Sequence, residues 1–190
     1  MKIKRILAYL LDMFIIGIVI ILISSFMQTK NMNVLGIEIG SLNEQFLMHK
    51  VSFITYLNHY SIAFYDLEKQ KILINFITLL MMIIYFVVVP YKTNGKTLGK
   101  MIFEIKISKE NINITDYMIR AFMINGLGYT LFSLLLIFIL PSFSYFLTIS
   151  VIAFMQLALV ITSFFMLLYN KGKTLEDMFT KTSVIEEVKK

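Results

Sequence analysis

Long apolar blocks alternate with polar segments along the chain, and these blocks set the predicted architecture. They cover residues 6–27, 72–91, 121–140 and 146–169, to within a residue or two. A transmembrane helix needs about 20 mostly apolar residues, because each adds about 1.5 Å across a hydrocarbon core of about 30 Å. Each block has this length, so the pattern predicts an all-α membrane protein with four transmembrane helices.

The ends of the blocks carry helix-terminating signals. Pro90 lies at the end of the second block, where a missing backbone N–H costs least. Between the third and fourth blocks, residues 141–144 read Pro-Ser-Phe-Ser, which is typical of a tight turn. We therefore expect the last two helices to form an antiparallel hairpin.

The first block could also be read as a signal peptide, since Lys2, Lys4 and Arg5 precede it. The apolar region of a signal peptide has only about 7–15 residues and ends in a cleavage site of small residues. The block here is longer, and residues 24–27, Ser-Ser-Phe-Met, make a poor site. An uncleaved first span is the better interpretation.

The outer segment, residues 28–71, is long for the connection between two spans. It is rich in aromatic residues, and its apolar residues recur at a partly helical spacing. Aromatic side chains are enriched at membrane–water interfaces. We expect an interfacial helix over residues 43–66, which would lie in the headgroups, cover the mouth of the bundle or dock a partner.

The charges support a membrane protein and orient it. Of the 190 residues, 58% are hydrophobic and 16% charged, whereas soluble domains average about 45–50% and about 25%. The net charge is +6, but the cations flank apolar blocks and form no basic face with interleaved aromatics, which argues against nucleic acid. Positive residues concentrate on the cytoplasmic side of membrane proteins. That rule predicts cytoplasmic N- and C-termini, with these cations on the inside: Lys2, Lys4, Arg5, Lys92, Lys96, Lys100, Lys106, Lys109, Arg120, Lys171, Lys173, Lys181, Lys189 and Lys190.

A Gly-Lys-Thr-Leu motif occurs twice, each time just after a predicted span. The motif residues are Gly95, Lys96, Thr97, Gly99 and Lys100 in the first copy, and Gly172, Lys173 and Thr174 in the second. A phosphate-binding loop needs a further glycine five residues before the Gly-Lys pair, and Pro90 and Leu167 stand there instead. The motif is therefore not interpreted as a nucleotide site.

Residues of strand type follow each copy of the motif, at 102–108 and 182–185. Both copies follow spans that run in the same direction, so we expect the two loops at the same depth. The first strand then pairs either with residues 182–185 or with a hairpin partner that turns at Glu110–Asn111 and returns through Ile112 and Ile114. Either pairing gives a small cytoplasmic β-element.

Several kinds of chemistry find no support in the sequence. There are no cysteines, which excludes disulfides and thiolate sites. The two histidines, His49 and His59, do not share a helix face, and no acidic cluster joins them, so we expect no metal site. No catalytic motif is present, and we expect neither a cofactor nor an enzymatic activity.

Asp12 lies inside the first span, where a lipid-facing carboxylate would cost about 2.5–3.5 kcal/mol or more. It must face the bundle, water or a partner, and Lys96, Lys100 or a backbone donor are the expected ligands of its carboxylate. Asn75, Asn125, Gln156 and Thr162 are further polar residues within or near spans. Such residues either join helices by hydrogen bonds or line a translocation path.

These motifs together resemble the RDD family of small bacterial membrane proteins, which is named after an arginine and two aspartates. Residues 5–12 are similar to the opening Arg-x-x-Ala-x-x-x-Asp, residues 95–107 to the family's loop and strand, and residues 173–184 to its ending. The resemblance implies a single domain over residues 1–190 in the cell membrane. It assigns the arginine and aspartates to Arg5, Asp12 and Asp177, which we expect to form a polar cluster at the cytoplasmic mouth or part of a transport path.

Two classes of function stay open at this point. One is a small transporter, or a transporter subunit, for ions or small solutes, as suggested for some members of the family that the chain resembles. The alternative is a non-catalytic accessory, assembly or immunity-type protein that acts through a partner. That partner would be a second copy of the chain or another membrane protein in the same lipid bilayer.

Overall fold

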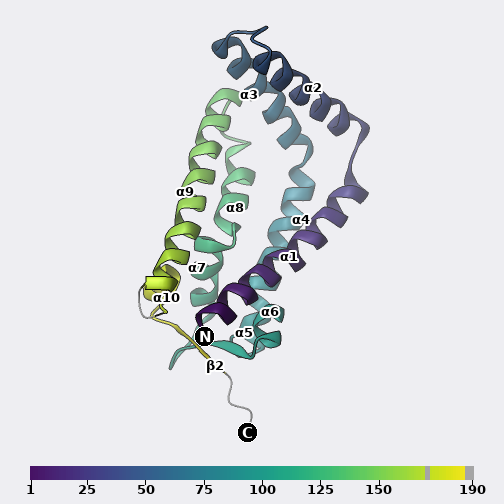
Figure 1. The fold of residues 1–190 in the computed structure, drawn as a ribbon. Coiled ribbons are helices and arrows are strands. Elements are labelled where there is room, and N and C mark those ends of the chain that lie inside the picture. Colours follow the sequence, from purple (N-terminus) through teal and green to yellow (C-terminus); the bar gives the residue numbers. More distant parts are fainter. Residues whose placement is uncertain (170–171, 187–190) are drawn as a thin grey trace.

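The computed structural model describes residues 1–169 and 172–186, and it is almost entirely helical (Figure 1). In chain order the elements are α1 (Lys2–Met27), α2 (Lys30–Leu47), α3 (Phe53–Gln70), α4 (Ile72–Ile83), a π-helical turn (Ile84–Val88), α5 (Val89–Lys92), α6 (Leu98–Ile102), β1 (Ile105–Ser108), α7 (Ile114–Ile124), α8 (Leu127–Leu136), α9 (Ser142–Tyr169), α10 (Leu175–Thr180) and β2 (Ser183–Glu186).

Three helical segments of the described chain are long and apolar enough to cross a membrane: Lys2–Met27, Ile72–Lys92 and Ser142–Tyr169. A fourth crossing is formed if α7 and α8 count as one span, although the two helices meet at an angle of 78°. Large apolar side chains on these segments face outward, as Phe14, Phe76 and Phe154 do. The predicted all-α membrane fold is therefore confirmed.

The third span differs from its predicted range of 121–140. It begins at Ile114 and breaks at Asn125–Gly126, where Gly126 adopts a φ of +79° that favours glycine. The break frees backbone carbonyls, and other spans bind them. The Tyr9 hydroxyl of α1 donates to the Ile124 carbonyl at 3.1 Å, and the Gln156 amide of α9 donates to the Met123 carbonyl at 2.7 Å. These bonds satisfy backbone groups that lipid could not.

The second span contains a π-helical turn just before Pro90. The Val89 N–H reaches back five residues to the Ile84 carbonyl, and proline has no N–H to continue the α-helical pattern. The wider turn leaves three consecutive residues, Tyr85, Phe86 and Val87, buried. This places the Tyr85 hydroxyl inside the bundle.

The outer segment forms a pair of helices, so the single interfacial helix predicted for residues 43–66 is wrong. The chain turns between α2 and α3, where His49 has a φ of +55° and Ser52 caps α3 by accepting the Thr55 N–H at 3.2 Å. Stacking of Phe46 on Tyr56, with ring centroids 4.5 Å apart, holds the two helices together. We call this side of the molecule, residues 28–71, the hairpin end.

The opposite end carries both Gly-Lys-Thr-Leu loops and the N-terminus (Figure 1). We call it the loop end; it comprises residues 93–113 and 172–186. There β1 pairs with β2 in antiparallel register, from Ile105 opposite Glu186 to Ser108 opposite Ser183. The predicted pairing with the C-terminal strand is confirmed. The alternative hairpin through Ile114 is wrong, because a capping box formed by Asn113 and Asp116 starts α7 there.

Candidate functional site

Asp12 projects from α1 into the bundle and is only 3% exposed. Its Oδ1 accepts hydrogen bonds from the Tyr85 hydroxyl at 2.6 Å and from the Gly99 N–H at 2.8 Å, and its Oδ2 accepts one from the Thr97 hydroxyl. From the sequence, the expected partner of Asp12 was Lys96, Lys100 or a backbone donor. In the structure it is a backbone donor, the Gly99 N–H. The carboxylate thus binds two hydroxyls and the first turn of α6.

The contact between Asp12 and the first loop depends on two residues of that loop, Thr97 and Gly99. Thr97 is the N-cap of α6, and the Gly99 N–H is among those that a helix start leaves without an intrahelical partner. A Cβ on Gly99 would lie 2.3 Å from the Ala8 carbonyl oxygen of α1. Only glycine therefore lets α6 approach α1 closely enough for Asp12 to cap it.

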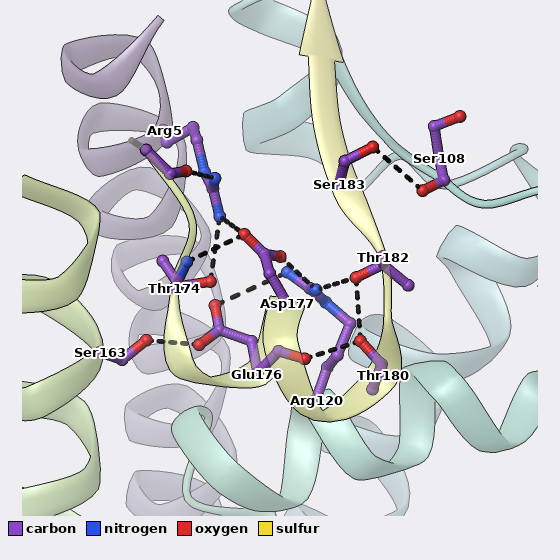
Figure 2. Close-up of polar contacts among 11 residues, drawn as sticks. Arg5, Ser108, Arg120, Ser163, Thr174, Glu176, Asp177, Thr180, Thr182 and Ser183 are labelled. Carbon is purple, nitrogen blue, oxygen red and sulfur yellow. Dashed lines mark hydrogen bonds and ion pairs between the residues drawn. The ribbon is translucent and has the colours of Figure 1, made fainter. Parts of the chain in front are cut away.

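Asp177 lies in α10 and is 1% exposed. Arg5 and Arg120 bind it from two sides (Figure 2): Arg5 Nη2 lies 2.6 Å from Oδ2, and Arg120 Nη1 lies 2.6 Å from Oδ1. Asp177 Oδ2 also accepts the Thr174 N–H at 3.1 Å, which caps α10. Each carboxylate oxygen thus has its own arginine, an arrangement of strong charge-assisted hydrogen bonds.

Further bonds tie the two arginines to the surrounding elements (Figure 2). Arg5 donates to the Gly172 carbonyl and to the Thr174 hydroxyl, and Arg120 donates to the Thr182 hydroxyl at 2.6 Å. Glu176 is also buried; its Oε1 lies 3.6 Å from Arg120 Nη2, and its Oε2 accepts the Ser163 hydroxyl. The cluster therefore joins α1, α7, α9 and the C-terminal segment.

The charges around Asp177 fix its protonation state. Burial alone raises the pKa of this carboxyl, but the charges of Arg120 and Arg5 and their hydrogen bonds outweigh it and lower the pKa to about 2. At Lys100 on α6, by contrast, burial is not outweighed by the neighbouring charges. Burial and the neighbouring charge of Arg120 lower the pKa of its ammonium to about 8, against the weaker attraction of Asp12 and Glu176. At neutral pH Asp177 is ionised and Lys100 is mostly protonated.

The repeated motif has the same geometry in both copies. In each, a glycine has a left-handed backbone, with φ of +91° at Gly95 and +77° at Gly172, and the threonine two residues later is the N-cap of a short helix. A carboxylate then accepts a backbone N–H at the helix start: Asp12 of α1 accepts that of Gly99 in the first copy, and Asp177 of α10 accepts that of Thr174 in the second. The motif is thus a loop that presents a helix start to a buried carboxylate.

The expectation of one cluster of an arginine and two aspartates needs correction. The contact between Arg5 and Asp177 is present, but Asp12 binds a separate set of partners. Residues of both sets line a cavity of about 100 Å³, Thr97 from the first and Arg5 and Thr174 from the second, together with Lys100. Among the remaining motif residues, Lys96 is half-buried and Lys173 is exposed.

The comparison with protein families adds to this geometry. The model of the RDD family matches residues 3–181, nearly the whole chain, and the match includes both aspartates and Arg5. The chain belongs to the RDD family. No significant match was found among the curated proteins or the solved structures. In this RDD protein the arginine and the second aspartate form one buried ion pair, and the first aspartate caps α6.

Two members of the buried cluster, Arg120 and Glu176, were not anticipated as site residues. Arg120 was counted only among the cytoplasmic cations, and Glu176 only as part of the family's ending. A signal for Arg120 does exist in the sequence. It stands four residues after Asp116 at the start of an apolar block, a spacing that places both on one helix face, and a cation there requires a buried partner.

The double ion pair predicts unequal losses of stability. Arg5→Ala leaves Asp177 bound to Arg120, whereas Asp177→Ala leaves both arginines without their carboxylate. Breaking a buried pair from one side costs about 3–5 kcal/mol. We expect Asp177→Ala to cost about that much and Arg5→Ala less, with a double-mutant loss below the sum, in unfolding of the purified protein in detergent.

Lys4→Ala is the matched control, because the partner of Lys4, Glu186, has a side chain that is 50% exposed. A surface pair of this kind contributes about 0–1 kcal/mol. Strictly additive losses in the Arg5 and Asp177 variants would show that the two residues do not interact.

Proposed function

We propose that this RDD protein is a small transporter, or a transporter subunit, for ions or small solutes, and not an enzyme. The observation that carries this is a pair of cavities, one toward each end of the bundle, which approach each other at the break in the third span. Transport across a bilayer requires polar access from both sides and a barrier between them. The described residues supply candidates for all three parts.

The cavity toward the hairpin end has a volume of about 620 Å³ and lies among α1, α2, α3, α4 and α8. Ten of its sixteen described lining residues are polar, and they include an ion-paired group, since Glu68 binds Lys71 at 3.4 Å and Asn75 at 3.0 Å. The polar residues that line it are Ser24, Ser25, Gln28, Glu68, Lys71, Asn75, Thr78, Tyr129, Thr130 and Ser133. These groups can form hydrogen bonds with a polar solute that enters from the hairpin end.

An apolar side chain, Met82, lies between the two cavities. The sulfur of Met82 accepts a hydrogen bond from the Thr130 hydroxyl at 3.6 Å, and Thr130 lines the hairpin-end cavity. The Met82 Cε lies 3.6 Å from where a Cβ on Gly126 would stand, next to Asn125 of the loop-end cavity. Phe86, four residues after Met82, already lines the loop-end cavity. Thr78, four residues before Met82, lines the hairpin-end cavity. Eight residues, or about 12 Å of helix, therefore separate the two spaces along this span, with Met82 midway.

The break at Asn125–Gly126 supports the same proposal. Non-helical backbone at membrane depth is tolerated where it lines a cavity, and discontinuous helices commonly form the binding sites of secondary transporters. Here the break follows Asn125, which lines the loop-end cavity.

The orientation that we propose places the loop end in the cytoplasm of a cell membrane. The described cations at or near that end are Lys2, Lys4, Arg5, Lys92, Lys96, Lys100, Lys106, Lys109, Arg120, Lys173 and Lys181. Lys171, Lys189 and Lys190, counted on the same side from the sequence, lie outside the described residues. The hairpin end has Lys30, Lys50, Lys69 and Lys71. This asymmetry follows the positive-inside rule.

The absence of cysteine from the sequence makes the orientation directly testable. We expect a single cysteine at Lys50, on the exposed turn of the hairpin end, to react with a membrane-impermeable maleimide in intact cells. A cysteine at Glu110, exposed at the loop end, should react only after the membrane is opened. Equal labelling of both in opened membranes is the control, and labelling of Glu110→Cys in intact cells would reverse the orientation.

The transport proposal is tested by solute entry into proteoliposomes, followed by light scattering with sodium acetate, potassium chloride and glycerol as probes. We expect entry of at least one probe to be faster than into protein-free vesicles. Met82→Ala should then speed it several-fold, because the shorter side chain opens the barrier.

Met155→Ala is the matched control, since Met155 is 60% exposed on α9, away from both cavities. It should leave the rate unchanged. If neither wild type nor Met82→Ala admits any probe faster than empty vesicles, the transport proposal fails. The alternative of an accessory protein acting through a partner would then be favoured.

A further inference from the structure

One residue that lines the loop-end cavity has a buried hydroxyl without a partner. Tyr117 lines this cavity and is 1% exposed. Its hydroxyl is the single buried side-chain polar atom of the described chain that makes no hydrogen bond. Buried polar groups in folded proteins nearly always have a partner, so such an atom calls for an explanation. A ligand in the cavity would provide one.

Lys100 is the second group whose bonding capacity is not used. Its ammonium carries three donors and lines the same cavity, yet within residues 1–169 and 172–186 it forms no hydrogen bond or ion pair. The nearby carboxylates are already occupied. Asp12 accepts three hydrogen bonds, and Glu176 binds Ser163 and Arg120.

The charge that faces the cavity is positive. Arg5, Lys100 and Arg120 line it, whereas Glu176 is the single acidic residue among the described lining residues. Asp177, whose single carboxylate binds both arginines, does not line the cavity. A net positive lining with free N–H and O–H donors favours an anion with oxygen acceptors.

The remaining walls limit the size and shape of the occupant. Phe86, Val160, Phe164 and Leu167 form an apolar side of the cavity, whose volume is about 100 Å³. For comparison, an engineered apolar cavity of about 150 Å³ holds benzene, and a cavity needs about 10–15 Å³ to hold one water molecule. The space therefore fits a carboxylate- or phosphate-sized group with a short apolar part.

We propose that the loop-end cavity binds a small oxyanion, with Lys100 and Tyr117 as the residues that recognise it. The anionic group lies against the Lys100 ammonium and the Tyr117 hydroxyl, with the arginines behind them supplying positive charge. The apolar part lies against Phe86 and the α9 side chains. That this anion is the transported solute rests on the proposed function; that it binds does not.

Two sources could supply this chemistry: a soluble anion such as a short-chain carboxylate, or the headgroup of an anionic lipid. Phe164, on the apolar wall, is 44% exposed on α9, so the cavity lies close to the outer surface of the bundle. The two sources are separated by measuring binding of soluble anions to purified protein and, in parallel, the lipid that accompanies the protein.

The test uses the full chain purified in a neutral detergent, with sodium butyrate, sodium phosphate or sodium chloride at constant ionic strength. We expect butyrate or phosphate, but not chloride, to raise the melting temperature in a saturable way. At 100-fold excess over the dissociation constant, the shift should be about 5–10 °C for a chain of this size. Lys100→Gln should weaken binding at least about tenfold, and Tyr117→Phe a few-fold.

Lys92→Gln and Tyr91→Phe are the matched controls, because both residues are exposed and lie outside the cavity. Each should bind the anion like wild type. Lys100→Arg retains the charge and should restore part of the affinity, which separates loss of the ammonium from a general folding defect. If Lys100→Gln does not fold, the test rests on the tyrosines. Tyr117→Phe must then bind the anion more weakly than Tyr91→Phe.

Native mass spectrometry measures which lipid accompanies the purified protein. An anionic lipid that accompanies wild type but not Lys100→Gln would support the site and identify the headgroup as its occupant. If neither soluble oxyanions nor anionic lipids bind in a way that depends on Lys100 and Tyr117, the inference is overturned. Binding without solute entry into vesicles would instead support the site and contradict transport, so the two proposals can fail separately.

Discussion

The buried contact of Asp177 with Arg5 and Arg120 is the interaction on which the loop end depends. Each arginine comes from a different membrane segment, so this single carboxylate joins α1 and α7 to the C-terminal segment. An unpaired charge at this depth would be costly, and the second arginine makes the anion favourable despite its burial. The bonds to Thr174, Thr182 and Gly172 then fix where the chain turns after α9.

The two repeated loops and the small sheet depend on this contact. With the C-terminal segment held by Asp177, β2 lies beside β1 and covers Ile105 and Ile107. The strand β1 in turn follows α6, which Asp12 caps from α1. Arg5, Asp12 and Asp177 therefore close one end of the bundle. The same closure surrounds the cavity in which Lys100 and Tyr117 have free donors.

The apolar blocks were sufficient to predict the membrane fold, and the resemblance to the RDD family was sufficient to predict that Arg5 and Asp177 meet. The remaining features depend on local backbone chemistry that hydropathy does not report. The third span was predicted to start too late because Asp116 and Arg120 interrupt its apolar pattern, whereas the cap at Asn113 starts the helix earlier. Tyr85 was missed as a partner of Asp12 because the π-helical turn changes the face on which it lies. The cap at Ser52 divides an outer segment whose aromatic spacing continues past it.

The pH dependence of stability tests the central contact most directly, by comparing wild type with Asp177→Asn in detergent from pH 7 to pH 2. The pKa of Asp177 is lowered from 3.8 to about 2, so its ionised form stabilises the fold above the unfolded-state pKa. That contribution is lost as the pH falls through the folded-state value. We predict that Asp177→Asn is less stable by at least about 2 kcal/mol at pH 7, with a difference that narrows below about pH 4 and nearly closes at about pH 2. A difference that stays constant across this range would contradict the account.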